Sequence, residues 1–196
     1  MTGLRAAIFL DKDGTLLEDV PFNADPSRMR WAPTARAALD MLGALRMPLF
    51  VVTNQAGIAQ GLLQEADMDV IASELRARFA SCGAALAGYY FCPHAPAGEG
   101  GPTCACRKPG PGMLVRAAAE HRIALDRSWM VGDILDDIEA GRRAGCRTIL
   151  VDNGNETQWR LSPERMAHAR VPTLEAAARV IVSQCGAEAT PSRRTA

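Results

Sequence analysis

The sequence predicts an α/β fold: a doubly wound, Rossmann-like parallel sheet with helices on both faces. Along the 196 residues, short runs of branched aliphatic residues alternate with longer stretches that carry apolar residues at helical spacing. The aliphatic runs are apolar on both sides, as expected for parallel strands covered on both faces. A chain of this length, 48% hydrophobic, can bury one substantial core but not two ordinary enzyme domains. We therefore expect a single domain over residues 1–185.

Each expected element follows from this alternation. The expected strands are residues 6–10, 49–53, 88–91, 128–132 and 148–151. The alanine-rich stretches between and after them, each with polar residues along one side, are expected to be helices. Their ranges are 34–46, 65–82, 112–122, 136–144 and 173–184. The small, polar segment 186–196 is expected to be a disordered tail.

Two long connections interrupt the pattern, at residues 11–33 and at the Gly- and Pro-rich segment 93–112. Compact domains usually keep loops of this length for function. Neither is long enough to form a separate cap domain, so we expect a capless protein with an open site built from loops.

The balanced charge of the chain argues against binding to highly charged partners such as nucleic acid or membranes. Lysine plus arginine equals aspartate plus glutamate, 22 of each, so no net field attracts nucleic acid or an anionic membrane. No apolar run is long enough to cross a bilayer, and the first residues lack the features of a signal peptide. We expect a cytoplasmic protein that binds neither nucleic acid nor membrane. Because no partner helix or coiled-coil stripe stands out, we also expect a monomer.

Two carboxylates, Asp11 and Asp13, follow the first expected strand directly. Open α/β sheets bind ligands at this edge, and neighbouring negative charges require a cation or a shared proton. Asp-x-Asp-Gly also occurs in ordinary turns and in calcium loops. However, Leu16 and Leu17 lie where an EF-hand loop would continue toward further oxygen ligands. The position therefore favours a functional site over a turn.

The run Asp-Lys-Asp-Gly-Thr after an apolar strand resembles the signature of the haloacid dehalogenase-type phosphatases. The resemblance implies that Asp11 is a nucleophile that becomes phosphorylated. It also implies that Asp13 protonates the leaving oxygen and then activates water. This covalent route divides one difficult displacement into two easier steps, and magnesium offsets the negative charge.

Further motifs of the same family are present. Thr53 matches the motif that holds phosphoryl oxygens, and Lys108 matches the lysine that neutralises the nucleophile and the phosphoryl group. Alone, Thr53 would more often be a capping residue and Lys108 a surface charge. Asp133 ends another apolar strand and is expected to bind magnesium with Asp11 and the backbone carbonyl of Asp13.

Asp136 and Asp137 have two interpretations. Either could hold a metal-bound water, yet acidic residues are common in the first turn of a helix because they favour its dipole. We expect Asp133 to be the only direct magnesium ligand among these three residues.

Cys92, His94, Cys104 and Cys106 form a common donor set for structural zinc. The alternatives are free thiols, or a disulfide between Cys104 and Cys106 that would close a strained, short ring and be opposed by a reducing cytoplasm. We expect a zinc loop over residues 92–106 that positions the catalytic lysine. Four protein ligands leave no open position, so this zinc should not act as the Lewis acid of the reaction.

The combined motifs resemble a subgroup that contains D-glycero-D-manno-heptose 1,7-bisphosphate 7-phosphatase and histidinol-phosphate phosphatase. Thr-Asn-Gln-Ala-Gly-Ile-Ala at 53–59 and Arg-Lys-Pro-Gly-Pro-Gly-Met at 107–113 are more similar to the heptose enzyme. Two places depart from the heptose enzyme. Residues 20–22 read Val-Pro-Phe where His-Gly-Tyr is typical, and Ile134 stands where a lysine is typical. We expect a small sugar phosphate as substrate, with contacts from Asp19, Thr53, Asn54, Gln55, Arg107 and Lys108.

Three alternatives stay open. Histidinol phosphate or another small sugar phosphate could be the substrate. A zinc-stabilised interaction module without catalysis is disfavoured by the complete set of motif residues. A nucleic-acid end phosphatase is disfavoured by the balanced charge and by the lack of a basic, aromatic-bearing groove.

Overall fold

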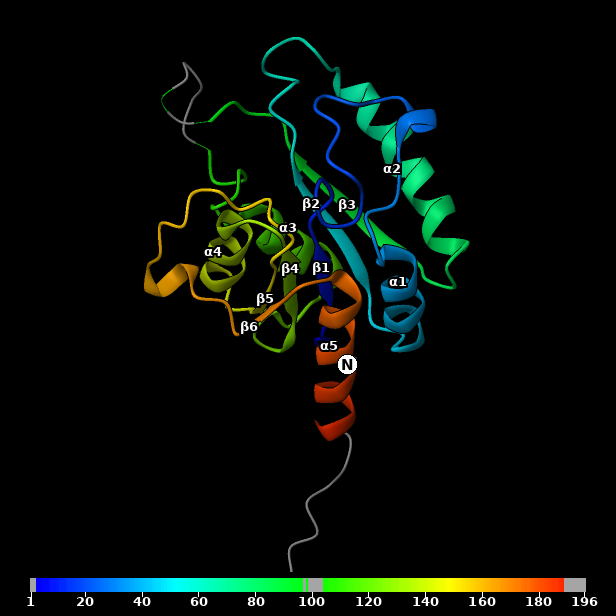
Figure 1. Cartoon of the computed structure of the whole chain (residues 1–196), viewed down its shortest axis with the longest axis vertical. Helices are drawn as coiled ribbons and strands as arrows, with labels where there is room; N and C mark the ends of the chain where they lie inside the picture. The colour runs from blue at the N-terminus through cyan, green and yellow to red at the C-terminus, as the bar shows by residue number, and fades with distance from the viewer. Residues whose placement is uncertain (1–2, 97, 99–103, 189–196) are drawn as a thin grey trace, which may run out of the picture.

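The computed structural model describes residues 3–96, 98 and 104–188 and centres on a six-stranded parallel sheet (Figure 1). The strand order is β3-β2-β1-β4-β5-β6, and every neighbouring pair is parallel. This confirms the predicted doubly wound α/β architecture. The strands are β1 (Ile8–Leu10), β2 (Leu49–Asn54), β3 (Leu86–Cys92), β4 (Trp129–Gly132), β5 (Arg147–Val151) and β6 (Ala169–Val171).

Five α-helices cover the two faces of the sheet. Buried residues of α1, α2 and α5 pack on one face, and those of α3 and α4 contribute to the packing on the other. The helices are α1 (Ala35–Ala44), α2 (Glu65–Ala80), α3 (Gly112–His121), α4 (Leu135–Arg143) and α5 (Leu174–Glu188). Short 3-10 turns lie at Pro26–Arg28, Leu125–Arg127 and Pro163–Arg165. Within the described ranges, none of the helices combines the length and the apolar character needed to span a bilayer.

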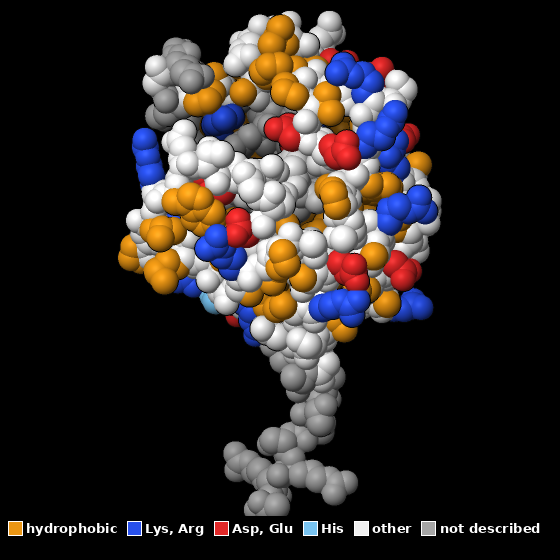
Figure 2. Space-filling view, in the orientation of Figure 1, with side chains coloured by type: hydrophobic (Ala, Val, Ile, Leu, Met, Phe, Trp, Pro, Cys, Tyr) orange, Lys and Arg blue, Asp and Glu red, His pale blue; other side chains and the backbone are white. Residues whose placement is uncertain are grey.

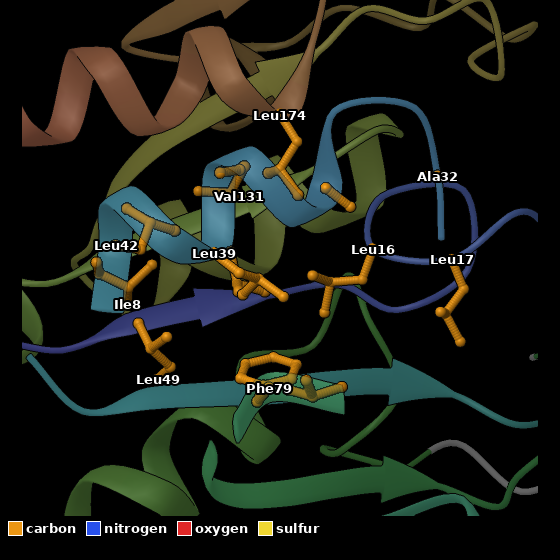
Figure 3. Packing of buried hydrophobic residues seen from close by; sticks show 14 of the residues in the cluster. Ile8, Leu16, Leu17, Ala32, Leu39, Leu42, Leu49, Phe79, Val131 and Leu174 are labelled. Carbon is orange, nitrogen blue, oxygen red and sulfur yellow. The ribbon is translucent and has the colours of Figure 1, made fainter. Parts of the chain in front are cut away.

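The central strand shows how the sequence divides the core. Side chains alternate across a strand, so Ile8 packs with Leu39 and Leu49 on one face (Figure 3). Phe9 points to the opposite face and stacks on Phe50 of β2, with ring centroids 5.2 Å apart. All five side chains are buried. A continuous apolar run therefore fills both layers.

The order in which strands are added to the sheet reverses at β1, and this reversal determines where a ligand site can form. From β1 the chain builds outward to β2 and β3, and it then returns to place β4 on the other side of β1. The connections that follow β1 and β4 therefore diverge, and such a switch point leaves a crevice at the carboxyl ends of the strands. In Figure 1 these ends point to the top, where the loops after β1, β2 and β3 gather.

The structure differs from the sequence-based prediction mainly at element boundaries. Strand β6 was not predicted, because its three residues lie at the sheet edge and show no hydrophobic run. Helix α5 continues to Glu188, so the predicted disordered tail is wrong for residues 186–188, while residues 189–196 lie outside the described part. Residues 11–34 contain one 3-10 turn and no cap domain.

Candidate active site

A cleft of about 410 Å³ opens at the carboxyl ends of the central strands. Figure 2 shows a hollow in the upper part of the molecular face, with charged side chains near its rim. The cleft brings together residues from β1, β2, β4 and the loop before α3. Its lining includes most of the predicted site residues: Asp11, Asp13, Asp19, Thr53, Asn54, Gln55, Lys108 and Asp133.

Lys108 reaches the end of β1 from a loop that is distant in sequence. Its Nζ forms an ion pair with Asp11 Oδ1 and donates to the backbone carbonyl of Val52 at 3.0 Å. Burial raises the pKa of Asp11 to about 7, although the charge of Lys108 opposes this shift. Burial alone would lower the pKa of Lys108, but the carboxylates of Asp11 and Asp137 outweigh it and raise that pKa. Lys108 is therefore a fixed positive charge beside Asp11.

Asp133 is held in one orientation by two neutral donors. Thr15 Oγ1 donates to Asp133 Oδ1 at 2.7 Å, and Asn155 Nδ2 donates to Oδ2 at 2.7 Å. Gly14 passes so close that a Cβ there would lie 2.2 Å from Asp133 Oδ2, and its φ of +82° also favours glycine. Burial and the charge of Asp11 raise the pKa of Asp133 to about 6 despite these hydrogen bonds.

Asp136 and Asp137, which sequence reasoning could not separate, face different partners. Asp137 is fully buried, and its Oδ1 lies 2.6 Å from Lys108 Nζ. Asp136 instead forms an ion pair with Arg165 at 2.6 Å. They are the second and third residues of α4, so the rotation of this helix decides which of them faces Lys108. Asp137 therefore belongs to the site in a way that the sequence prediction missed.

Asp13 is less buried than Asp11 and faces a different set of partners. Its Oδ1 forms an ion pair with Lys12, and its Oδ2 accepts from Gln55 Nε2 at 3.0 Å. The same amide group donates to Thr53 Oγ1 at 2.9 Å, which leaves the threonine O–H free to donate toward the cleft. These contacts place a carboxylate and a hydroxyl donor on the β1 and β2 side of the cleft.

The carboxylates of Asp11, Asp133 and Asp137 fit a divalent cation. All three are buried, and oxygen atoms from each lie within 4.8 Å of one another. Within the described part of the chain, Lys108 provides the one positive charge paired with these acids, so a further cation would relieve their repulsion. Carboxylate oxygens are the ligands that Mg²⁺ prefers. The predicted involvement of the Asp13 backbone carbonyl stays a prediction.

Cys92, His94, Cys104 and Cys106 converge as the sequence analysis expected. Cys106 Sγ lies 3.2 Å from Cys92 Sγ, 3.3 Å from Cys104 Sγ and 3.3 Å from His94 Nδ1. Cys92 Sγ lies 3.6 Å from Cys104 Sγ and 3.4 Å from His94 Nδ1. Ligands of a tetrahedral zinc site with bonds of about 2.3 Å are separated by about 3.8 Å. The four thiol and imidazole groups thus fit zinc, and the three cysteines are not in disulfides.

Hydrogen bonds connect this cysteine cluster to Lys108. The backbone N–H of Arg107 donates to Cys104 Sγ at 3.4 Å, and its guanidinium donates to the carbonyl of His94 at 3.1 Å. The backbone N–H of Lys108 donates to Asn54 Oδ1 at 3.0 Å, and Asn54 Nδ2 donates to the backbone carbonyl of Lys108 at 3.1 Å. Arg107 itself is not among the residues that line the cleft, so its role in substrate binding stays a prediction.

Two further residues of the site escaped the sequence analysis. Asn155 lies in the loop after β5, far in sequence from any motif, and orients Asp133. Lys12 lies between the two motif aspartates, yet its ion pair with Asp13 could not be read from its position alone. A side chain contributed by an irregular loop leaves no periodic pattern to detect.

Comparison with known proteins agrees with this geometry. Residues 105–177 match a family model described as HAD-hydrolase-like. The chain is 38% identical to D-glycero-beta-D-manno-heptose-1,7-bisphosphate 7-phosphatase of Pasteurella multocida (strain Pm70) over 77% of this chain and 84% of that protein. It is also 38% identical to the enzyme of the same name from Yersinia pestis, over 79% and 84% of the two chains.

A solved structure extends the comparison to the fold. It is D,D-heptose 1,7-bisphosphate phosphatase from B. bronchiseptica, complexed with magnesium and phosphate, and it superposes with a TM-score of 0.75 at 28% identity. The match covers 91% of this chain and 99% of that one. The chain therefore belongs to the haloacid dehalogenase-like hydrolases, in the family of the D-glycero-beta-D-manno-heptose-1,7-bisphosphate 7-phosphatases.

Proposed function

We propose that this protein is a magnesium-dependent phosphatase that removes the 7-phosphate of D-glycero-D-manno-heptose 1,7-bisphosphate. The relatives named for this reaction, 38% identical over most of the chain, support the substrate. The observation that carries the chemistry is the buried group of Asp11, Lys108, Asp133 and Asp137 at the carboxyl ends of β1 and β4. It pairs a nucleophile with a fixed cation and with carboxylates that suit a divalent metal.

Asp11 is the proposed nucleophile. One of its carboxylate oxygens forms a bond to phosphorus while the bond from phosphorus to the sugar oxygen breaks. Asp13, held by Gln55, gives its proton to that leaving oxygen. Asp13 then takes a proton from a water molecule that attacks the phosphoryl group, which releases inorganic phosphate and restores Asp11.

The other residues stabilise charge on the transferring group. Lys108 neutralises Asp11 and the phosphoryl oxygens, and the Thr53 hydroxyl donates a hydrogen bond to one of them. Asp11, Asp133 and the backbone carbonyl of Asp13 are the proposed magnesium ligands, with Asp137 beside them. A magnesium ion bound there would supply positive charge between the carboxylate and the phosphate.

We also propose that Cys92, His94, Cys104 and Cys106 bind a structural zinc ion. The hydrogen bonds from Arg107 to this cluster support a positioning role, because the next residue is Lys108. The substrate would then lie between Lys108, which follows the zinc loop, and the loop that carries Asp19.

The test is phosphate release with magnesium from heptose 1,7-bisphosphate, both anomers, alongside histidinol phosphate and a simple hexose phosphate. A preference for the heptose is expected. Activity confined to histidinol phosphate or the hexose phosphate would keep the chemistry but change the substrate. No turnover of any phosphomonoester with magnesium would favour an inactive interaction module instead.

A further inference from the structure

Among the described residues that line the cleft, no cation is left unpaired for a second phosphate group. Its two cationic lining residues are Lys12 and Lys108, and both form ion pairs with carboxylates of the site. The other residues of the lining are neutral or acidic, and they include Ile134, Asn155 and Asp19. A substrate that carries two phosphates would bring further negative charge into this region. Its second phosphate therefore requires a cation from outside the cleft.

A second cavity, of about 350 Å³, adjoins the cleft. The two share Ile134 and Asn155, so these side chains form a ridge between them. The loop after β5 forms much of the second cavity, and Thr157, Gln158 and Arg160 lie in its lining. A ligand held at Asp11 could therefore extend past Ile134 into this second cavity.

Two arginines line the second cavity, and they differ in their partners. Arg165 is held by Asp136 and Glu139, each at 2.6 Å. Arg160 is exposed, and within the described ranges no carboxylate forms an ion pair with its guanidinium. Arg160 is therefore the cation of this cavity that remains open to a ligand.

Glu156 is one of two acidic residues four positions from Arg160, and it already has partners. Glu156 accepts from the backbone N–H of Leu135 at 2.8 Å and from that of Gln158 at 2.6 Å. These bonds fix the loop after β5 to the start of α4, on the side of the cavity that carries Ile134. A guanidinium offers a planar pair of donors that matches two phosphate oxygens.

We propose that Arg160 binds the phosphate that is not cleaved, with the sugar crossing the ridge of Ile134 and Asn155. This assignment rests on the proposed function, because it requires a substrate with two phosphates. Arg160 would thus form a second anion subsite outside the cleft that contains Asp11.

The test compares two substrates in the full-length protein with magnesium: heptose 1,7-bisphosphate and the 7-monophosphate of the same heptose. Arg160→Gln should lower kcat/KM for the bisphosphate by about tenfold or more, through a higher KM, and leave the monophosphate within about twofold. Arg160→Lys should recover part of the loss, since it restores the charge without the planar donors. Arg36→Gln, at an exposed position of α1, is the matched control and should change neither substrate.

The outcomes separate this inference from the proposed function. If wild-type protein hydrolyses both heptose phosphates but Arg160→Gln affects them equally or not at all, the subsite is refuted while the phosphatase stands. A selective loss in Arg107→Gln with none in Arg160→Gln would move the second phosphate to the zinc loop and refute the assignment. If wild-type protein hydrolyses neither compound, the proposed function itself fails.

Discussion

Among individual residues, the site carboxylates are held together against their mutual repulsion. Asp11, Asp133 and Asp137 are buried within reach of one another, and Lys108 is the cation that touches two of them. Burial raises the pKa of Asp11 to about 7 and that of Asp133 to about 6. The folded, metal-free protein therefore binds protons at these groups more tightly than the unfolded chain does.

Asp11→Asn should abolish turnover and leave the fold intact. Removing the nucleophile is expected to lower kcat by at least about a thousandfold. Because the folded pKa of Asp11 is raised, its ionisation destabilises the metal-free fold progressively as the pH rises from about 4 to 7. The asparagine lacks this ionisation. Thermal unfolding of the metal-free variant at pH 8 should therefore give a Tm no lower than that of the wild type.

Asp69→Asn is a matched control for this variant, because it removes an exposed carboxylate of α2 that does not line the cleft. It should retain turnover through the phosphorylated Asp11. Retained phosphate release in Asp11→Asn would reject the nucleophile assignment, and a Tm well below wild type at pH 8 would reject the electrostatic argument.

The motif aspartates, Thr53 and Lys108 were predictable because each follows an apolar run or a recognised motif. Asp136 and Asp137 were not separable, since both are acidic residues in the first turn of a helix. Only the rotation of α4 decides that Asp137 faces Lys108 and that Asp136 faces Arg165. That rotation is set by tertiary packing, which the local sequence does not encode.

Among structural elements, the cysteine cluster could be predicted from the sequence, whereas the edge strand β6 could not. Cys92, Cys104 and Cys106 could be assigned to one cluster because their chemistry has few alternatives. Strand β6 could not be predicted from the sequence, because its three residues lie at the sheet edge and pair with β5 only once the rest of the sheet has formed. Short elements that depend on neighbours carry little signal of their own.

Cys106→Ala should release zinc and lower both stability and rate. Losing one of four ligands weakens the site, and the loop that leads into Lys108 then loses its anchor. We expect zinc content to fall well below about one ion per chain and the free energy of unfolding to fall by more than about 2 kcal/mol. Metal analysis and urea unfolding measure the two effects.

Cys185→Ala is the control, because Cys185 lies on α5 outside the cluster and contacts Met47. It should keep its zinc. Unchanged metal content in Cys106→Ala would refute the zinc site, and zinc loss with unchanged kcat would refute the positioning of Lys108.

On the scale of the whole molecule, the two hydrophobic layers determine where the strand ends lie. Leu39 on α1 is fully buried and packs on the face of the sheet that includes Ile8 and Leu49 (Figure 3). The site residues at the ends of β1 and β2 are several residues away along the same strands. The alternation of aliphatic runs with helical stretches predicted this arrangement, because covering both faces of a parallel sheet leaves few other layer structures.

Leu39→Ala should therefore lower stability much more than it lowers catalysis. Truncating a buried leucine leaves a cavity and costs about 2–5 kcal/mol, whereas Val115→Ala, on an exposed position of α3, should stay within about 0.5 kcal/mol of wild type. Urea unfolding gives both values. Phosphate release per folded molecule should change less than about threefold in Leu39→Ala, because the register of the strands that end near the site is set by the pairing of Ile8–Leu10 with Leu49–Val51. A large loss of kcat with little loss of stability would mean instead that α1 positions the active carboxylates directly.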